Sequence, residues 1–243
     1  MMPKSLAPPA MPKTDNTLQD SAAHLARQVA RHWTGLRHVQ AKGTRVRLAA
    51  TDGENLPGLV AMRIVGGRLR GRSLVSPRTD AIRPTTDRTR ESLFNILSNR
   101  IDFNGLRVID LFAGTGALGI EALSRGAGFA LFVETSTEGR GLLRSNMEAL
   151  GLTGSARIFR RDATSIGEPG TMAPFDLAFA DPPYGKGLGE LAAAQLRHGG
   201  WLKPDSLLIL EESNSAAPQI LPGYETVDQR RFGDSAIGIF RPA

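Results

Sequence analysis

The chain has 243 residues, a formal net charge of +6 and no cysteine. No apolar run approaches the roughly 20 residues that a membrane-spanning helix needs, so we expect a soluble protein, and the length of the chain allows a core of its own. The lack of cysteine is most simply explained by a cytoplasmic location. The lack of cysteine excludes disulfides, thiolate metal sites, iron–sulfur clusters and a cysteine nucleophile, and nothing else in the sequence indicates a metal site.

The positive charge is concentrated in the first part of the chain. Basic and acidic residues number 8 and 4 in residues 1–61, 9 and 4 in residues 62–105, and 13 and 16 in residues 106–243. This asymmetry predicts a basic surface attached to a nearly neutral body, which is typical of a protein that binds nucleic acid. The same three ranges are the predicted divisions of the chain.

The first division, 1–61, is predicted to be a largely disordered basic extension. Its first 20 residues lack hydrophobic periodicity. Between residues 22 and 39 apolar residues recur at helical spacing among arginines, which favours a basic amphipathic helix.

The second division, 62–105, is predicted to form a basic hairpin and a helix. RIVGGRLRGRSLV alternates short apolar runs with glycines and arginines, as a curled hairpin does. Pro84 blocks a helix before it, and Thr85 or Thr86 can cap a helix that ends near Asn99. Its predicted core residues are Leu93, Ile96 and Leu97.

The third division, 106–243, predicts an α/β fold with a doubly wound, Rossmann-like sheet of seven strands. The strand candidates RVIDL, FALFVE, ARIFR, FDLAFAD and LLILEE are separated by helical stretches at 117–125, 137–150 and 188–197. This alternation is typical of a parallel sheet. YETVDQRR and AIGIF lie a few residues apart and are predicted to form a terminal antiparallel hairpin.

A glycine loop, DLFAGTGALG, joins the first of these strands to a helix. Gly114, Gly116 and Gly119 have the G-x-G-x-x-G spacing that lets a backbone approach a ligand beside a helix N-terminus. Glu134 ends the next strand, where a carboxylate can accept hydrogen bonds from both ribose hydroxyls of an adenosine. Nicotinamide, flavin and methyl-donor enzymes share this pattern.

Two further carboxylates follow strands, and the second belongs to the tetrapeptide DPPY. Asp162 comes after the third strand and Asp181 after the fourth. Asp110 and Asp162 could each simply cap a turn or a helix, and Tyr184 could be an ordinary core aromatic. Their coincidence at successive strand ends favours a ligand site instead.

This constellation resembles the Class I methyltransferases that use S-adenosylmethionine. The resemblance implies that the glycine loop holds the methionine part of the cofactor, Glu134 the ribose and Asp162 the adenine edge. DPPY is similar to the motif of enzymes that methylate exocyclic amino groups of bases. The implied cofactor-binding residues are Asp110, Phe112, Ala113, Gly114, Thr115, Gly116, Glu134 and Asp162, and the implied catalytic residues are Asp181, Pro182, Pro183 and Tyr184.

Four segments in order, RIVGGRLRGRSL, RPTTDRTRESLFNIL, DLFAGTGALGIEALSRGA and DPPYGKG, narrow the resemblance to the bacterial RsmD family. That family implies an enzyme that methylates a guanine N2 of 16S rRNA in the small subunit or its assembly intermediate, as an rRNA (guanine(966)-N(2))-methyltransferase. Separately, we expect a monomer, because the sequence shows no extended surplus apolar face. Two of the implied RNA-contacting arginines, Arg83 and Arg88, could instead close over the cofactor or position the DPPY loop. The full set is Arg63, Arg68, Arg70, Arg72, Arg83, Arg88 and Arg90.

Residues 1–61 depart from this resemblance, because such proteins usually begin near the position of Met62. A misplaced start codon, an organellar presequence and a genuine RNA-binding arm are three interpretations, of which we favour a wrong start or a dispensable extension.

Three other functions remain open at the level of sequence. DPPY also fits an N6-adenine or N4-cytosine methyltransferase acting on DNA. The glycine loop fits an NAD-dependent oxidoreductase. A non-catalytic RNA-binding assembly factor is the fourth hypothesis.

Overall fold

The computed structural model describes residues 62–76, 86–215 and 220–243. These residues belong to one compact unit of the chain, Leu48–Ala243. The predicted helix at residues 22–39, the rest of the 1–61 extension and Arg83 lie outside the described residues.

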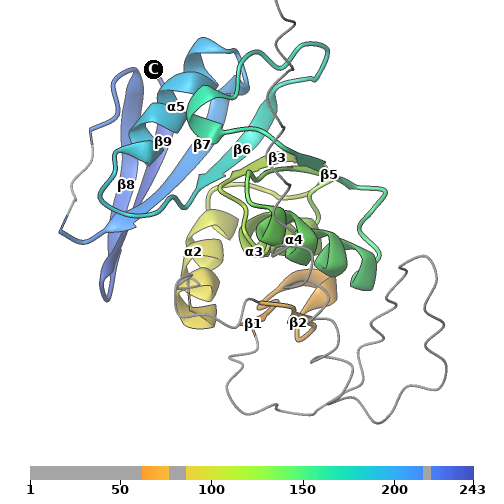
Figure 1. The fold of residues 1–243 in the computed structure, drawn as a ribbon. Helices are drawn as coiled ribbons and strands as arrows, with labels where there is room; N and C mark the ends of the chain where they lie inside the picture. The colour runs from red at the N-terminus through yellow and green to blue at the C-terminus, as the bar shows by residue number, and fades with distance from the viewer. Residues whose placement is uncertain (1–61, 77–85, 216–219) are drawn as a thin grey trace, which may run out of the picture. The chain divides into compact units, whose positions relative to one another are not determined.

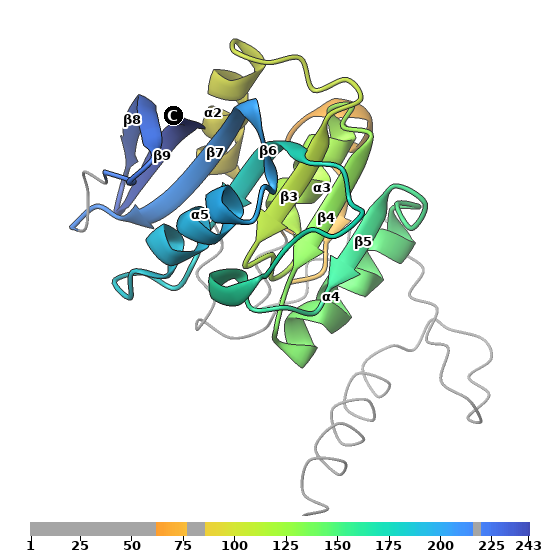
Figure 2. The same ribbon diagram turned by 90° about the horizontal axis from the view of Figure 1, so that it is seen from above.

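A seven-stranded sheet is the centre of the fold, as predicted. Its order is β5-β4-β3-β6-β7-β9-β8, and Figure 2 shows the strands side by side. The first five strands are parallel, and β9 is antiparallel to both β7 and β8. The bounds are β3 Arg107–Leu111, β4 Phe129–Val133, β5 Ala156–Phe159, β6 Phe175–Ala180, β7 Leu202–Ser213, β8 Tyr224–Phe232 and β9 Ser235–Pro242.

The predicted strands differ from the observed ones mainly at β7, which begins five residues earlier than LLILEE. Its first part, Leu202–Asp205, is half-buried or exposed, so it lacks the apolar run that marks a strand covered on both faces.

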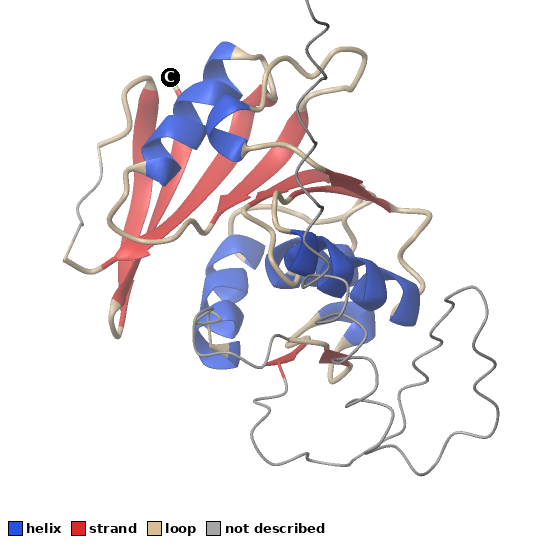
Figure 3. Ribbon diagram, viewed as in Figure 1, coloured by secondary structure: helices blue, strands red, loops and turns tan. Residues whose placement is uncertain are grey.

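Helices cover both faces of the sheet, which makes it doubly wound (Figures 1 and 3). α2 (Asp87–Ser98), α3 (Ala117–Ser124) and α4 (Thr137–Ala149) lie on one face, and α5 (Leu188–His198) lies on the other. Successive strand residues point to opposite faces. Val108 therefore belongs to the core under the first three helices, and Ile109 to the core under α5.

The caps explain where two of these helices begin. Thr86 is the N-cap of α2, and its side chain accepts a hydrogen bond from the Thr89 N–H at 3.2 Å. Ser136 caps α4 in the same way through the Gly139 N–H. Each side chain satisfies a backbone donor that has no partner within the helix.

The N-terminal hairpin is small but shares the main core. β1 (Met62–Arg63) and β2 (Ser73–Leu74) pair antiparallel around the short 3-10 helix η1 (Gly67–Leu69). The hairpin's buried apolar side chains join the cluster beneath α2, α3 and α4, so the predicted boundary at residue 105 does not separate two cores. These side chains are Met62, Ile64, Leu69 and Leu74.

Among the helices of the described residues, none is long and apolar enough to cross a membrane.

Candidate functional site

The carboxyl ends of four parallel strands meet at one edge of the sheet. β3 pairs with β4 on one side and with β6 on the other, so the strand order reverses beside β3. Leu111, the last residue of β3, is in register with both Val133 and Ala180. In open α/β sheets, ligands bind in the crevice at such a switch point. The glycine loop, Glu134 and the DPPY loop all leave the sheet here.

The glycine loop is a tight turn fixed to the neighbouring strand. The Ala113 N–H donates to the Val133 carbonyl at 3.0 Å, and the Gly116 N–H donates to the Ala113 carbonyl at 2.7 Å. Phe112 has φ +59°, the only positive value for a non-glycine among the described residues. Such backbone strain gathers at ligand-binding loops, where the surrounding structure holds it.

The glycines of the motif serve different purposes. A Cβ on Gly116 would lie 2.3 Å from Leu143, and one on Gly119 would lie 2.4 Å from the ring of Phe132. These two glycines are therefore required for packing against the protein interior. Gly114 needs its positive φ of +53°, but a Cβ there would meet nothing closer than 3.9 Å. The open side of the loop is at Gly114.

Asp110 lies beneath the loop. Its side chain is 2% exposed, and its Oδ2 accepts from the Gly119 N–H in the first turn of α3 at 2.9 Å. Burial raises the pKa of Asp110 to about 8, opposed by the Gly119 hydrogen bond and assisted by the nearby Glu134. Asp110, which was predicted to bind the cofactor, therefore holds the first turn of α3 in this structure.

Glu134 joins the loop to the beginning of α4. Its Oε2 accepts from the Gly114 N–H at 2.8 Å, and its Oε1 accepts from the Ser136 N–H at 2.6 Å. A Cβ on Gly139 would lie 2.9 Å from the carboxylate carbon. The carboxylate is thus oriented before any ligand arrives, and each oxygen retains a lone pair.

Asp162 follows β5 on the exposed rim of the same edge. It caps the 3-10 helix η2 (Ala163–Ser165), and its Oδ1 accepts from the N–H and the hydroxyl of Thr164 at 2.8 and 2.7 Å. Asp162 is thus a helix cap, the alternative role considered from the sequence. Its side chain is also exposed.

The DPPY loop is anchored to the two strands beyond β6. The Tyr184 hydroxyl donates to Glu211 Oε1 at 2.8 Å and shares a hydrogen bond with the Ser235 hydroxyl at 3.0 Å. The Gly185 N–H donates to Glu212 Oε1 at 3.0 Å. Tyr184 is nevertheless 37% exposed. It is therefore no ordinary core aromatic, because one end is tethered and part of the ring remains accessible.

The surroundings of Tyr184 are acidic. Burial of its hydroxyl raises the pKa of Tyr184, and the carboxylates of Glu211 and Asp181 raise it further. Glu211 and Glu212 are 4% and 2% exposed. Sequence reasoning missed both residues, although a signal was present: a pair of carboxylates ends the strand run LLILEE.

Five of the predicted RNA-contacting arginines are exposed, four in the N-terminal hairpin and one on α2. They are Arg63, Arg68, Arg70, Arg72 and Arg88. The Arg72 guanidinium donates to the carbonyl of Ala149, the last residue of the 13-residue α4, at 3.1 Å. At 1.5 Å per residue, that contact lies about 20 Å along the helix from the sheet edge that holds Glu134.

Arg90 must be removed from the predicted RNA contacts. Its side chain is 0% exposed, donates to the Arg63 carbonyl and to Asp87 Oδ1, and lies 3.9 Å from the buried Glu121 carboxylate. A charged group is buried in this way only when it is paired. Arg90 therefore holds α2 against the hairpin and α3.

α3 fixes the turn of the hairpin. The Ser124 hydroxyl accepts from the Leu69 N–H at 2.9 Å and donates to the Gly66 carbonyl at 2.6 Å. Glu121 Oε2 accepts from the Val65 N–H at 2.9 Å. A Cβ on Gly67 would lie 2.0 Å from the Ser124 carbonyl oxygen, so the two backbones touch.

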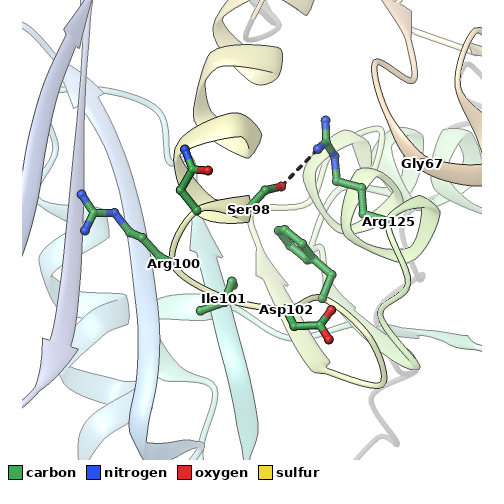
Figure 4. Close-up of a pocket in the computed structure, with 8 residues that line it drawn as sticks. Gly67, Ser98, Arg100, Ile101, Asp102 and Arg125 are labelled. Atoms are coloured by element: carbon green, nitrogen blue, oxygen red, sulfur yellow. Dashed lines mark hydrogen bonds between the residues drawn. The ribbon is translucent and has the colours of Figure 1, made fainter.

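A surface depression lies near the other end of β3 (Figure 4). Its lining includes Ser98, Arg100 and Arg125. Arg125 donates to Ser98 and pairs with Glu121, and Arg100 pairs with Asp228 at 2.5 Å. The chain leaves this region to enter β3, whereas the glycine loop follows that strand. The depression is therefore separate from the switch-point site.

Comparisons with known proteins agree on one family. The model of the family described as "Conserved hypothetical protein 95" matches residues 62–241. The Escherichia coli K12 protein named "Ribosomal RNA small subunit methyltransferase D" is 36% identical over 189 residues, which cover 77% of this chain and 93% of that protein. A Haemophilus influenzae protein of the same name is 35% identical, covering 66% and 83%. The solved structure of the yhhF protein of Escherichia coli superposes with a TM-score of 0.64 at 33% identity, covering 75% of this chain and 98% of that one.

Proposed function

The chain belongs to the RsmD family of rRNA methyltransferases, and from this premise we propose that it transfers a methyl group from S-adenosylmethionine to the exocyclic N2 of a guanine in 16S rRNA. One observation carries the proposal: the register of Leu111 with Ala180 places the glycine loop beside the DPPY loop at the switch point of a Class I methyltransferase fold. The donor and the acceptor of the methyl group can therefore meet.

The residues present fit the cofactor. Glu134 is an oriented carboxylate with lone pairs for the two ribose hydroxyls, and Asp162 offers an exposed carboxylate to the adenine amino group. The open side of Gly114 allows close approach to the loop. When bound, the cofactor supplies a methyl group that is already activated by a sulfonium.

The protein's part in the reaction is alignment of the base. An exocyclic amine is a weak nucleophile because its lone pair is delocalised into the ring. The Asp181 carboxylate and a main-chain carbonyl of the diproline would accept its two N–H groups, turning the nitrogen lone pair towards the methyl carbon. The tethered Tyr184 ring would stack on the flipped base. Strong basicity at Asp181 is not required.

The substrate assignment is supported by the names of the two bacterial relatives and by the hairpin. Both relatives are named as methyltransferases of small-subunit rRNA. The exposed arginines of the hairpin and of α2 would bind phosphates. We propose that the enzyme works as a monomer in the cytoplasm, where small subunits assemble. The proposed phosphate contacts are Arg63, Arg68, Arg70, Arg72 and Arg88.

The test is to incubate purified protein with labelled S-adenosylmethionine and small subunits from cells lacking the gene, and to identify the product by nucleoside mass spectrometry. We expect N2-methylguanosine. Methylated adenine or cytosine in a parallel DNA reaction, with inert subunits, would favour the DNA methyltransferase alternative. Calorimetric binding of NAD without binding of S-adenosylmethionine would favour an oxidoreductase.

An Asp181→Ala variant separates an enzyme from an assembly factor. It should lose turnover while still binding S-adenosylmethionine, since Asp181 acts on the base. The matched control is Asp205→Ala, an exposed aspartate in the first part of β7, which should retain full turnover. Normal subunit assembly in cells that carry Asp181→Ala would favour the assembly-factor reading.

A further inference from the structure

One buried amide connects the hairpin to the glycine loop. Asn146, on the inward face of α4, is 1% exposed. Its Oδ1 accepts from the Val75 N–H at 2.7 Å, and its Nδ2 donates to the Val75 carbonyl at 3.1 Å and to the Thr115 carbonyl at 2.9 Å. Both N–H groups of the amide are thereby used.

The Val75 contacts resemble the pairing of two strands. Val75 directly follows β2, and the amide of Asn146 meets both polar groups of its backbone as a neighbouring strand would. Beyond the last residue of β2, the backbone of the hairpin is therefore paired with a side chain of α4 and not with another strand. The end of the hairpin therefore has a fixed place beside the glycine loop.

The Thr115 contact acts on the turn of the glycine loop. The Thr115 carbonyl and the Gly116 N–H belong to one planar peptide, so holding the first orients the second. The Gly116 N–H closes the turn by donating to the Ala113 carbonyl at 2.7 Å. The Thr115 hydroxyl also contacts Met62 Sδ in β1, at 3.8 Å. Thr115 is thus joined to both ends of the hairpin.

We infer that Asn146 is a positioning residue, which sets the glycine loop for the cofactor and fixes the arginine-bearing hairpin to that loop. The inference rests on the proposed function in one respect: it takes the loop as the cofactor site and the hairpin as an RNA contact. Asn146 itself contacts neither ligand. It acts through the peptide between Thr115 and Gly116 and through the backbone of Val75.

Two substitutions at Asn146 separate its hydrogen bond from the Val75 N–H from its hydrogen bonds to the two carbonyls. Asn146→Asp keeps an oxygen that can accept from the Val75 N–H but has lost the N–H groups that served the two carbonyls. Asn146→Leu keeps the branched shape and the number of side-chain heavy atoms, although its methyl groups are bulkier, and loses all three hydrogen bonds. Asn95→Asp is the matched control, because Asn95 is an exposed asparagine on α2.

The variants are compared by calorimetric affinity for S-adenosylmethionine and by amide hydrogen exchange. Both should bind the cofactor about tenfold more weakly, as expected for one buried hydrogen bond lost from the loop. The Gly116 amide should exchange faster in both. The Val75 amide should stay protected in Asn146→Asp and exchange faster only in Asn146→Leu.

This split distinguishes positioning from a general loss of stability, which would speed exchange at Val75 in both variants. Cofactor affinity within twofold of the parent protein in Asn146→Leu would overturn the inference, and that variant suffices should Asn146→Asp fail to fold. If the parent protein binds no S-adenosylmethionine, the proposed function fails instead, and the exchange pattern alone still decides whether Asn146 joins the hairpin to the loop.

Discussion

Tyr184 illustrates how a residue in the site can be held at one end and free at the other. Its hydroxyl is tethered to Glu211 of β7 and to Ser235 of β9, while the residue is 37% exposed. A fixed ring loses less conformational entropy when a base stacks on it than a mobile ring would. The tether should therefore contribute to RNA affinity without touching the RNA.

Removing the tether while keeping the ring tests this reasoning. Tyr184→Phe should raise the KM for small subunits about fivefold to tenfold, the effect of one or two lost hydrogen bonds. Tyr184→Ala should cost more, because stacking on an aromatic ring is worth about 1–3 kcal/mol per base. Steady-state kinetics with purified subunits gives both values.

The second tyrosine of the chain is the control. The Tyr224 hydroxyl donates to the Ala193 carbonyl in the core under α5, away from the DPPY loop. Tyr224→Phe should lower the thermal midpoint and leave the KM unchanged. Equal KM values for Tyr184→Phe and the parent would show that the tether has no role in RNA binding.

The position of a residue could be predicted when it follows from its neighbours in the sequence, and could not be predicted when it depends on residues far away in the chain. Glu134 and Asp181 directly follow buried strands, and the parallel pattern alone places them at one edge. Arg90 was predicted wrongly, although it lies three and seven residues before Leu93 and Leu97 and so shares their buried helix face. Glu211 contacts Tyr184 across 27 residues, and no local pattern encodes such a contact.

Among the elements, the N-terminal hairpin combines two roles. Its apolar residues complete the core beneath α2 and α3, while its turn projects Arg68 and Arg70. The alternation of apolar and basic residues is visible in the sequence, but the burial of the hairpin was not. An arginine-rich segment is easily interpreted as a surface attached to the fold. The charged residues interrupt its apolar pattern, so the few apolar residues that anchor it in the core are not recognised.

The turn arginines should contribute to the salt dependence of substrate binding. Replacing Arg68 and Arg70 together with Ala should weaken subunit binding and reduce the slope of log K against log salt by about 1.4–1.8, as expected for two lost phosphate contacts. Arg72 is left intact because its bond to Ala149 supports the end of α4. Filter binding over a range of salt concentrations gives the slope.

Two exposed arginines of the seven-stranded sheet are the control for this measurement. Arg231 of β8 and Arg241 of β9 lie on the terminal hairpin. Replacing both with Ala removes the same charge from the protein and should leave the slope unchanged. Equal slopes for the two double variants would show that Arg68 and Arg70 act only through net charge.

The elements of the sheet were the most predictable part of the molecule. Among the described residues, every strand candidate is a strand and the helices begin within two residues of their predicted starts. Buried parallel strands read as apolar runs, and capping residues mark the starts of α2 and α4. The alternation of strands and helices also predicted the parallel pairing. The order of the strands depends on contacts between distant segments, so the local sequence pattern did not predict it.

For the whole molecule, Asp110 connects the site to folding stability. Its pKa of about 8 in the native state lies above the ordinary value of 3.8, so between these values the native state holds a proton that the unfolded chain has released. Stability should therefore fall as pH rises from about 4 to about 8 and be level above that range. The full window corresponds to a loss on the order of 5 kcal/mol.

Asp110→Asn tests this contribution, because an amide oxygen can still accept from the Gly119 N–H but does not titrate. The variant should therefore lack the share of the fall in stability with rising pH that Asp110 causes. Urea unfolding of the cofactor-free protein at a series of pH values gives the comparison, with the exposed Asp205→Asn as control. A variant that loses as much stability with rising pH as the parent protein would contradict the assignment.

The tether of Tyr184 also has a consequence during synthesis of the chain. Asp181 and Tyr184 are translated before Glu211, and the Ser235 hydroxyl that completes the tether comes 51 residues after the tyrosine. A nascent chain, or a product truncated before residue 235, can carry the whole DPPY motif and still lack the complete tether of its ring. Under the proposed function, such fragments would contain both sequence motifs and should still fail to hold the target base.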